Sequence, residues 1–199
     1  MNKKQLAIFL SKLKKVEKPK VELEQYSTDE EIVAHILWHA FLHEDIEEKV
    51  IADFGCGNGI FGIGCLALNA KKVYFVDKDE ESIEIAKANC GFNNVEFLNI
   101  DISEFKEKVD LVIQNPPFGV QNRKADKPFL EKAMQVADKI YTIHKIESKG
   151  FINVLCEENG FLVNGIIGFD FPIKKSMEFH KKKEHKVRVG CWILEKRKL

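Results

Sequence analysis

The sequence predicts an α/β fold: a doubly wound, seven-stranded sheet whose last strand is antiparallel, preceded by an N-terminal helical extension. Three observations lead to this fold class. Strand-like and helix-like patterns alternate from Val50 onward, as they do in parallel sheets that carry helices on both faces. A glycine-rich turn follows the first of these strands. No helical pattern separates the last two strands, so the final strand is expected to be inserted antiparallel from a long loop.

The N-terminal part is predicted to be helical. Apolar residues recur at helical spacing over Gln5–Val16, and an extended linker follows over 20–26. Thr28 is the expected N-cap of a second helix, with Glu31 completing a capping box, and this helix should end near His43. The sequence therefore divides into an extension over 1–44 and a main domain over 45–199.

The remaining elements alternate. The predicted strands are Val50–Phe54, Val73–Asp77, Val95–Ile100, Asp110–Asn115, Ile140–His144, Phe161–Phe169 and Lys186–Leu194. The predicted helices are Ile60–Asn69, Asp79–Cys90, Lys127–Ala137 and Glu147–Glu158. Ligands of such sheets bind at the carboxyl ends of the strands, so the residues that follow each strand are the candidates for function.

Composition limits the class of protein. The 199 residues suit one domain, and 45% apolar residues are enough for a core. No apolar run is long enough for a membrane span or a signal peptide, so we expect a cytoplasmic protein. The five cysteines are scattered and form no Cys-x-x-Cys pair, which predicts neither a disulfide framework nor a metal site.

The net charge of zero hides a strong separation of charge along the chain. Residues 1–20 carry a net charge of +6, residues 174–199 carry +7, and the middle carries −13. Two basic ends on an acidic body suggest a polyanionic partner. The alternative is that these lysines only keep the protein soluble.

A glycine-rich loop follows the first strand, and two cofactors compete for it. Gly57-x-Gly59-x-x-Gly62, with an acid twenty residues further on, formally matches the dinucleotide fingerprint. Asp53-x-Gly55-x-Gly57-x-Gly59 instead matches an S-adenosylmethionine loop, which adds an acid at the strand end. That acid suits a ligand with a cationic amino group, whereas it would repel a pyrophosphate.

Acids also end the second and third strands. Asp77 is placed to accept hydrogen bonds from two ribose hydroxyls, which either cofactor offers. Asp101 is placed to accept from an adenine amino group; the alternative is a helix N-cap or a surface turn.

The loop after the fourth strand decides in favour of methyl transfer. It reads Asn115-Pro116-Pro117-Phe118. A planar exocyclic amine is a poor nucleophile because its lone pair is delocalised into the ring. The side-chain oxygen of Asn115 and the carbonyl of Pro116 can accept its two hydrogens and so expose the lone pair to a methyl sulfonium. The prolines fix the turn and carry no competing N–H, and Phe118 offers a stacking face for a base.

These residues resemble those of the class I amino-methyltransferases. Nearly the whole chain is similar to one family, the methyltransferase-like-five ribosomal RNA adenine-N6 methyltransferases, in an archaeal-like form. The more specific parts of this resemblance are Leu23-Glu-Gln-Tyr26 and Phe179-His-Lys-Lys-Lys183. The resemblance implies a Rossmann-like methyltransferase domain, S-adenosylmethionine as cofactor, and N6 of an adenosine in small-subunit ribosomal RNA as the target.

The resemblance also implies roles for the N-terminal segment and for a partner. Gln25 and Thr28 would cover the cofactor as a lid, although Ser27 stands where the family has Pro. A small zinc-binding activator protein would pair with the strand over 95–100, which should lie at the edge of the sheet with little protection.

The remaining candidates concern RNA and metals. Lys181, Lys182, Lys183 and Arg188 are the predicted phosphate contacts. Cys56 lies in the cofactor loop and is expected to be a small packing residue. Three histidines at helical spacing are expected to form a polar helix face, so no metal is predicted. Two other functions stay open: a protein glutamine N5-methyltransferase, and a non-catalytic RNA-binding module that keeps the pocket as scaffold.

Overall fold

The computed structural model describes residues 1–199 except 18, 21–23, 26–27, 119–124, 173–185 and 198–199. The described strands are β1 (Val50–Phe54), β2 (Lys72–Asp77), β3 (Val95–Asn99), β4 (Leu111–Gln114), β5 (Lys139–Lys145), β6 (Phe161–Pro172) and β7 (Lys186–Lys196). The described helices are α1 (Lys3–Leu10), α2 (Glu30–Leu42), α3 (Ile60–Ala67), α4 (Glu80–Asn89), α5 (Lys127–Val136) and α6 (Lys149–Glu158), with 3-10 turns η2 (Ile102–Glu104) and η3 (Ile146–Ser148). None of these helices is long and apolar enough to cross a membrane.

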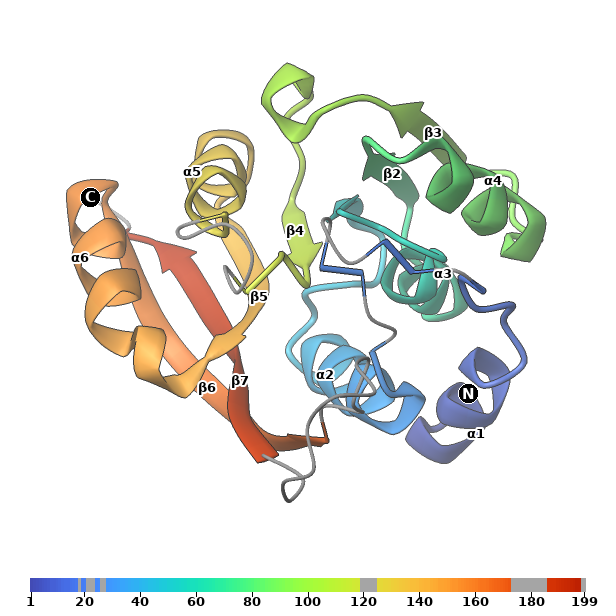
Figure 1. The fold of residues 1–199 in the computed structure, drawn as a ribbon, viewed down its shortest axis with the longest axis horizontal. Coiled ribbons are helices and arrows are strands. Elements are labelled where there is room, and N and C mark those ends of the chain that lie inside the picture. Colours follow the sequence, from blue (N-terminus) through green and yellow to red (C-terminus); the bar gives the residue numbers. More distant parts are fainter. Residues whose placement is uncertain (18, 21–23, 26–27, 119–124, 173–185, 198–199) are drawn as a thin grey trace.

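The strands form one seven-stranded sheet in the order β3-β2-β1-β4-β5-β7-β6 (Figure 1). The first five pair in parallel, and β7 lies antiparallel between β5 and β6. This confirms the predicted fold class, including the antiparallel last strand. The strand order reverses between β1 and β4, so a crevice is expected at their carboxyl ends.

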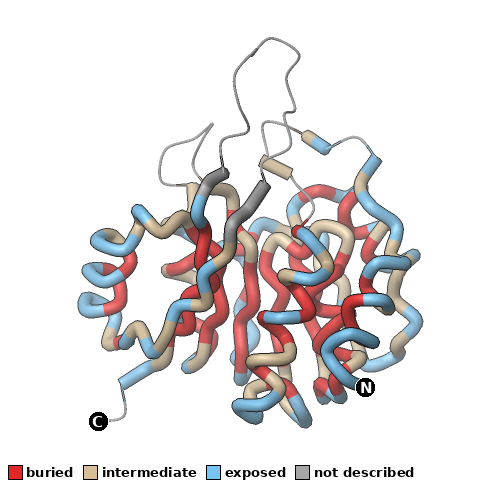
Figure 2. The backbone as a smooth tube through the Cα atoms, turned by 90° about the horizontal axis from the view of Figure 1, so that it is seen from below, coloured by how far each residue is buried: buried red, intermediate tan, exposed pale blue. Residues whose placement is uncertain are grey.

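The sheet is buried between two helical layers. Apolar side chains of α1, α2, α3 and α4 pack on one face, and those of α5 and α6 pack on the other. Figure 2 shows the buried segments running through the strands, with the exposed segments on the outer helices. The extension shares the first of these two clusters with α3, through Leu6 and Leu10. A separate unit over 1–44 therefore stays a prediction.

The predicted strand boundaries agree with the structure to within three residues. The first helix is the larger difference, because it ends at Leu10 and not near Val16. Its start is fixed by a capping box between Asn2 and Gln5. Beyond its end, the N–H of Lys14 donates to the Asn89 side chain at 2.9 Å, and the Lys14 carbonyl accepts from the same side chain at 3.0 Å. In a longer helix, the N–H and the carbonyl of Lys14 would form hydrogen bonds within that helix. Here both are bonded to α4.

The predicted cap of the second helix was also wrong. The N-cap is Asp29, whose side chain accepts from the N–H groups of Glu31 and Ile32. Thr28 does not cap the helix, and its hydroxyl oxygen accepts a hydrogen bond from Asn115.

Helix α3 packs so closely on β2 that it needs a glycine at the contact. A Cβ on Gly62 would come within 2.3 Å of the Phe75 ring and 2.9 Å of Val73. We expect Gly62→Ala to lower the free energy of unfolding by about 1–3 kcal/mol, because the core on both sides is filled. Gly150→Ala is the matched control, since that helical glycine has open space around it. Urea unfolding measures the stability of both variants, and equal stabilities would contradict the close packing of α3 on β2.

Candidate functional site

A cavity of about 430 Å³ lies at the carboxyl ends of the parallel strands, within the usual range for small-molecule sites. The structure brings many of the predicted residues to its wall: Gln25, Thr28, Gly55, Cys56, Gly57, Asp77, Asp101, Asn115 and Pro117. Asp53, Gly59, Pro116 and Phe118 are not among the described residues that line it.

The glycine loop over 55–59 forms the floor of this cavity. Gly55, Gly57 and Gly59 all have positive φ, between 54° and 83°, which glycine adopts without steric cost. A Cβ on Gly57 would meet nothing within 4 Å, so the backbone there faces open space. The loop thus lets a ligand approach the main chain closely.

Asp53 lies behind this loop and not on the cavity wall. Its carboxylate is buried and accepts the N–H of Gly62 at 2.9 Å. Because it precedes the last residue of β1, its side chain points between the sheet and α3 instead of beyond the strand end. Burial raises the pKa of Asp53 to about 7, although the Gly62 N–H opposes this. The expected contact with a cationic amino group stays a prediction.

The raised pKa of Asp53 has a consequence for stability. Between about pH 4 and pH 7 the folded protein binds more protons than the unfolded chain, so its stability should fall as the pH rises and level off above pH 7. Asp53→Asn removes this titration. Without ligand, urea unfolding at pH 5 and pH 8 should show the wild type losing roughly 1–3 kcal/mol more than the variant. Equal losses would refute the assignment of this proton to Asp53.

Asp77 lies at the end of β2, on the cavity wall. One carboxylate oxygen accepts the N–H of Gly57 and the other accepts the N–H of Asp79, both at 3.0 Å. Burial raises the pKa of Asp77, and these two N–H groups limit the shift. Each oxygen keeps a further lone pair, so the carboxylate is held in place and still able to accept from a ligand.

Asp101 combines the two roles that its sequence context allowed. Its side chain accepts from the N–H of Ser103 at 2.9 Å and caps η2, while the residue also lines the cavity. Hydrogen bonds from Ser103 lower the pKa of Asp101. It is therefore an anionic acceptor at the edge of the site.

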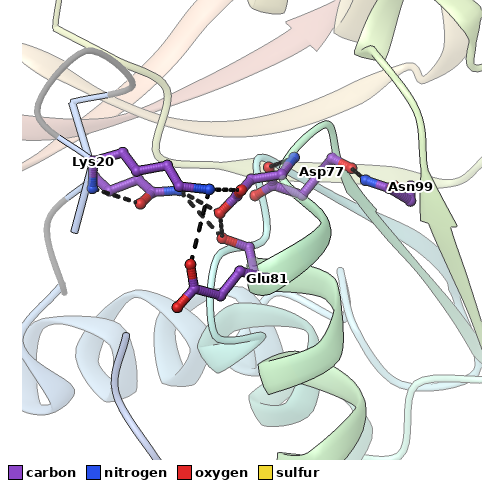
Figure 3. Close-up of polar contacts among 7 residues, drawn as sticks. Lys20, Asp77, Glu81 and Asn99 are labelled. Carbon is purple, nitrogen blue, oxygen red and sulfur yellow. Dashed lines mark hydrogen bonds and ion pairs between the residues drawn. The ribbon is translucent and has the colours of Figure 1, made fainter. Parts of the chain in front are cut away.

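The N-terminal segment is fixed over the cavity by Gln25 together with residues for which the sequence predicted no role: Lys20, Asp79 and Ser82. Gln25 donates to Asp79 at 2.9 Å and to Ser82 at 3.3 Å, and Lys20 forms an ion pair with Asp79. Figure 3 shows Lys20 reaching toward α4, where Glu81 also lies 3.8 Å from its Nζ. Burial alone would raise the pKa of Asp79, but the bonds from Lys20, Gln25 and Ser82 hold it below its ordinary value.

Figure 3 also shows Asn99, whose side chain donates to the Asp77 carbonyl at 3.1 Å. The end of β3 thus holds the end of β2, and with it the Asp77 carboxylate, in place.

Asn115 has one end of its side-chain amide occupied and the other open. Its Nδ2 donates to the hydroxyl oxygen of Thr28 at 2.9 Å. Its Oδ1 is buried and has no hydrogen-bond partner among the residues that the structure describes. Because buried polar atoms are nearly always paired, this acceptor, on a residue that lines the cavity, is a candidate partner for a ligand donor. Thr28 thereby sets which end of the amide faces that donor.

The rest of the loop after β4 divides between wall and core. Pro117 lines the cavity, Pro116 is buried, and Phe118 is half-buried against the first core cluster. Pro128 and Phe129 of α5 also line the cavity, and Phe129 lies against Gly55. Neither residue was predicted, because both follow a loop and not a strand.

The predicted RNA contacts fall mostly outside the described residues, because Lys181, Lys182 and Lys183 lie in 173–185. Arg188 is described and exposed, next to the Val189 that pairs with Lys145 at the carboxyl end of β5. Arg188 therefore lies near the carboxyl end of β5, and the cavity lies at the carboxyl ends of the same parallel strands.

The described cysteine and histidine residues bear on whether the site holds a nucleophile or a metal. Burial raises the pKa of Cys56 well above its ordinary value, so its thiol stays protonated. Among the described residues, no group of three or more His, Cys, Asp or Glu is arranged to hold a metal. His39 and His43 stack at 4.1 Å on the half-exposed side of α2.

Comparison with known proteins identifies similar chains. Residues 26–142 match the family described as the methyltransferase small domain. The chain is 32% identical to the rRNA N(6)-adenosine-methyltransferase METTL5 of Danio rerio, over 95% of this chain and 96% of the relative. It is 30% identical to the Mettl5 enzyme of Drosophila melanogaster, over 96% of this chain and 95% of the relative. A candidate RNA methyltransferase from Pyrococcus horikoshii, known as a crystal structure, superposes with a TM-score of 0.91 at 41% identity over 98% of each chain.

Proposed function

Because the chain belongs to the methyltransferase small-domain family and, within it, to the family of the Mettl5 enzymes, we propose that it methylates N6 of an adenosine in small-subunit ribosomal RNA. Membership of this family makes it an S-adenosylmethionine-dependent methyltransferase. The RNA and the methylated atom are the proposal. An RNA substrate inside the cell agrees with the cytoplasmic location that the sequence predicts.

The cavity fits S-adenosylmethionine. Gly57 leaves its backbone open to the cavity, and Asp77 and Asp101 offer carboxylates on the wall that suit ribose hydroxyls and an adenine amino group. Asp77 would serve a ribose of either cofactor, so the family of the chain, and not this acid, disfavours a dinucleotide. Gln25 and Thr28, from the segment above, would close the site over the cofactor. When bound, the cofactor supplies an electrophilic methyl group on a sulfonium.

The observation that carries the proposed target is the orphaned Oδ1 of Asn115. Thr28 occupies the amide nitrogen, so the side chain presents an acceptor and not a donor. An acceptor at this place suits an amine that must give up conjugation with its ring. Asn115 and the Pro116 carbonyl would each accept one hydrogen of that amine, which favours a tetrahedral nitrogen with its lone pair exposed. The stacking role of Phe118 belongs to the same proposal.

An adenine in a stacked helix cannot reach this cavity, so the base must be turned out of its stack. No general base with a shifted pKa is needed before attack, because the nitrogen can lose its proton after the methyl group has been transferred.

The basic ends support ribosomal RNA over a protein substrate. We expect Ala substitution of all three residues in Lys181–Lys183 to weaken RNA binding and to reduce the slope of log K against log salt by about 2–3. Binding at several salt concentrations measures this, with cofactor affinity unchanged. Ala substitution of Lys49, Lys71 and Lys108 is the control, because these precede β1, β2 and β4 at the opposite ends of the strands. An unchanged slope for the first variant would assign its lysines to solubility alone.

A protein glutamine N5-methyltransferase is the main alternative, since a similar Asn-Pro-Pro loop serves there. A non-catalytic RNA-binding module is the other. Transfer of a radiolabelled methyl group, offered to total RNA and to a peptide release factor, separates them. We expect label in the RNA only, whereas label in the release factor, or in neither, would contradict the proposal.

We also propose an activator protein that adds a strand to β3. The edge position of this strand supports the proposal, because within the described residues it pairs only with β2. The zinc-binding nature of this partner rests on the resemblance alone. A chain that is monodisperse and fully active by itself would show that no such partner is needed.

A further inference from the structure

A chain of four polar side chains runs behind the loop that carries Asn115. Gln114 Nε2 donates to Thr142 Oγ1 at 3.1 Å, and Thr142 Oγ1 lies 2.7 Å from His144 Nε2. His144 Nδ1 lies 3.2 Å from a carboxylate oxygen of Asp126. The first three side chains are at most 1% exposed, so these contacts are shielded from water.

The sheet register explains why these residues meet. Gln114 and Thr142 face each other on the parallel strands β4 and β5, and His144 follows on the same side of β5. This is the side on which Val112 and Ile140 pack against α5 and α6. Helix α5 begins directly after Asp126, which brings its carboxylate to the end of the row.

The donors can be arranged in one direction that satisfies every contact. Gln114 donates its N–H to Thr142, and Thr142 donates its hydroxyl hydrogen to Nε2 of His144. Nδ1 then carries the ring proton and faces the Asp126 carboxylate. The chain of hydrogen bonds therefore links a residue of β4 to the start of α5.

Asp126 gives up its usual local role to take part in this chain. It stands at the N-cap of α5, where an Asp side chain ordinarily accepts from a backbone N–H of the first turn, yet it makes no such bond. Its carboxylate is directed to His144 instead. The stability of α5 alone would favour a bond from this carboxylate to a backbone N–H of the first turn.

The two ends of this chain lie on either side of the proposed catalytic loop. Gln114 directly precedes Asn115, and Asp126 follows Phe118 after a short segment. Successive side chains at a strand point to opposite sides, so Asn115 turns toward Thr28 while Gln114 turns toward Thr142. The loop is thus anchored on both sides of the sheet.

We propose that Thr142, His144 and Asp126 are positioning residues for methyl transfer, which hold the Asn115 loop in the geometry that its acceptors need. They act through the loop and touch no substrate. This inference rests on the proposed function for its kinetic consequence, but the anchoring itself does not.

The test compares Asp126→Ala with Asp126→Asn. Asp126→Ala removes the acceptor for the His144 ring N–H, and we expect kcat to fall at least tenfold with KM for S-adenosylmethionine unchanged, since small misplacements of reacting groups are costly. Asp126→Asn keeps an acceptor oxygen and should recover most of kcat. Equal losses in the two variants, or an unchanged kcat in the Ala variant, would overturn the proposal.

Two further measurements separate positioning from simple stabilisation. Asn2→Ala removes a true N-cap in α1, remote from the cavity, and should lower Tm while leaving kcat unchanged. Asp126→Ala should lower Tm by no more than this control. Amide exchange by NMR should speed up at Asn115 and Phe118 in Asp126→Ala but not in Asn2→Ala, and unchanged exchange would also overturn the proposal. Because the exchange needs no RNA, a failure of the proposed function would be seen separately, as a wild type that methylates no RNA.

Discussion

Replacing Asn115 by Ala should nearly abolish methyl transfer while leaving the binding of S-adenosylmethionine intact. The variant removes the unpaired Oδ1 acceptor, whose bond to the amine strengthens only as the nitrogen becomes tetrahedral. Loss of one fixed polar group that acts in the transition state lowers kcat by roughly 100–1,000-fold. Steady-state kinetics and titration calorimetry measure the two quantities, and a loss confined to kcat identifies a transition-state interaction.

Two comparisons make this result specific. Asn94→Ala removes a different side-chain amide, one that donates to the backbone carbonyls of Ala70 and Lys71 and does not line the cavity. Its kcat should be unchanged. Thr28→Val should lower kcat by about tenfold because the Asn115 amide loses the acceptor that orients it, and Thr28→Ser should restore the rate. Near-native activity of Asn115→Ala would mean that the loop only turns the chain after β4 and takes no part in methyl transfer.

Replacing Asp77 by Ala should weaken the binding of S-adenosylmethionine at least 100-fold. Two charge-assisted hydrogen bonds to ribose hydroxyls are worth at least about 3 kcal/mol together, which is about two factors of ten in affinity. The carboxylate also holds the N–H groups of Gly57 and Asp79, so its removal loosens the loop that the cofactor needs. Titration calorimetry with the cofactor and with its demethylated product measures the loss.

Asp110→Ala is the matched control for this variant. Asp110 also accepts a backbone N–H, from Val50 at 2.8 Å, but it does so at the amino end of β1. Cofactor affinity should therefore be unchanged in Asp110→Ala. A similar affinity in the Asp77 and Asp110 variants would remove Asp77 from the binding site, and preferential binding of NADH would overturn the cofactor assignment.

The sheet and its glycine loop were predictable because their signals are local. Strands such as Val50–Phe54 are short apolar runs that end at acids or glycines, and the positive φ of Gly55, Gly57 and Gly59 is a demand that only glycine meets without cost. The insertion of β7 followed from the missing helix before it.

The contacts that complete the site were not predictable, because they join residues far apart in the sequence. Thr28 has the sequence pattern of an N-cap, and only the folded chain brings it to Asn115, 87 residues away. Lys20 and Asp79 meet across 59 residues. A local pattern also says nothing of direction: the Asp53 side chain points toward α3, and its expected contact with a ligand stays a prediction.

The chain from Gln114 to Asp126 shows a third limit. Asp126 directly precedes a helix, and such a position predicts a cap. Its choice of His144 depends on the register between β4 and β5 and on where α5 starts, which are properties of the tertiary fold.

The most direct test of the account identifies the methylated atom. Ribosomal RNA that lacks the modification is incubated with the protein and S-adenosylmethionine carrying a deuterated methyl group, digested to nucleosides, and analysed by mass spectrometry. The account predicts deuterated N6-methyladenosine from one small-subunit position with the wild-type protein, and a far lower yield from Asn115→Ala in the same incubation time. A labelled methyl group on any other atom of the RNA, or the same yield of N6-methyladenosine from the variant, would contradict it.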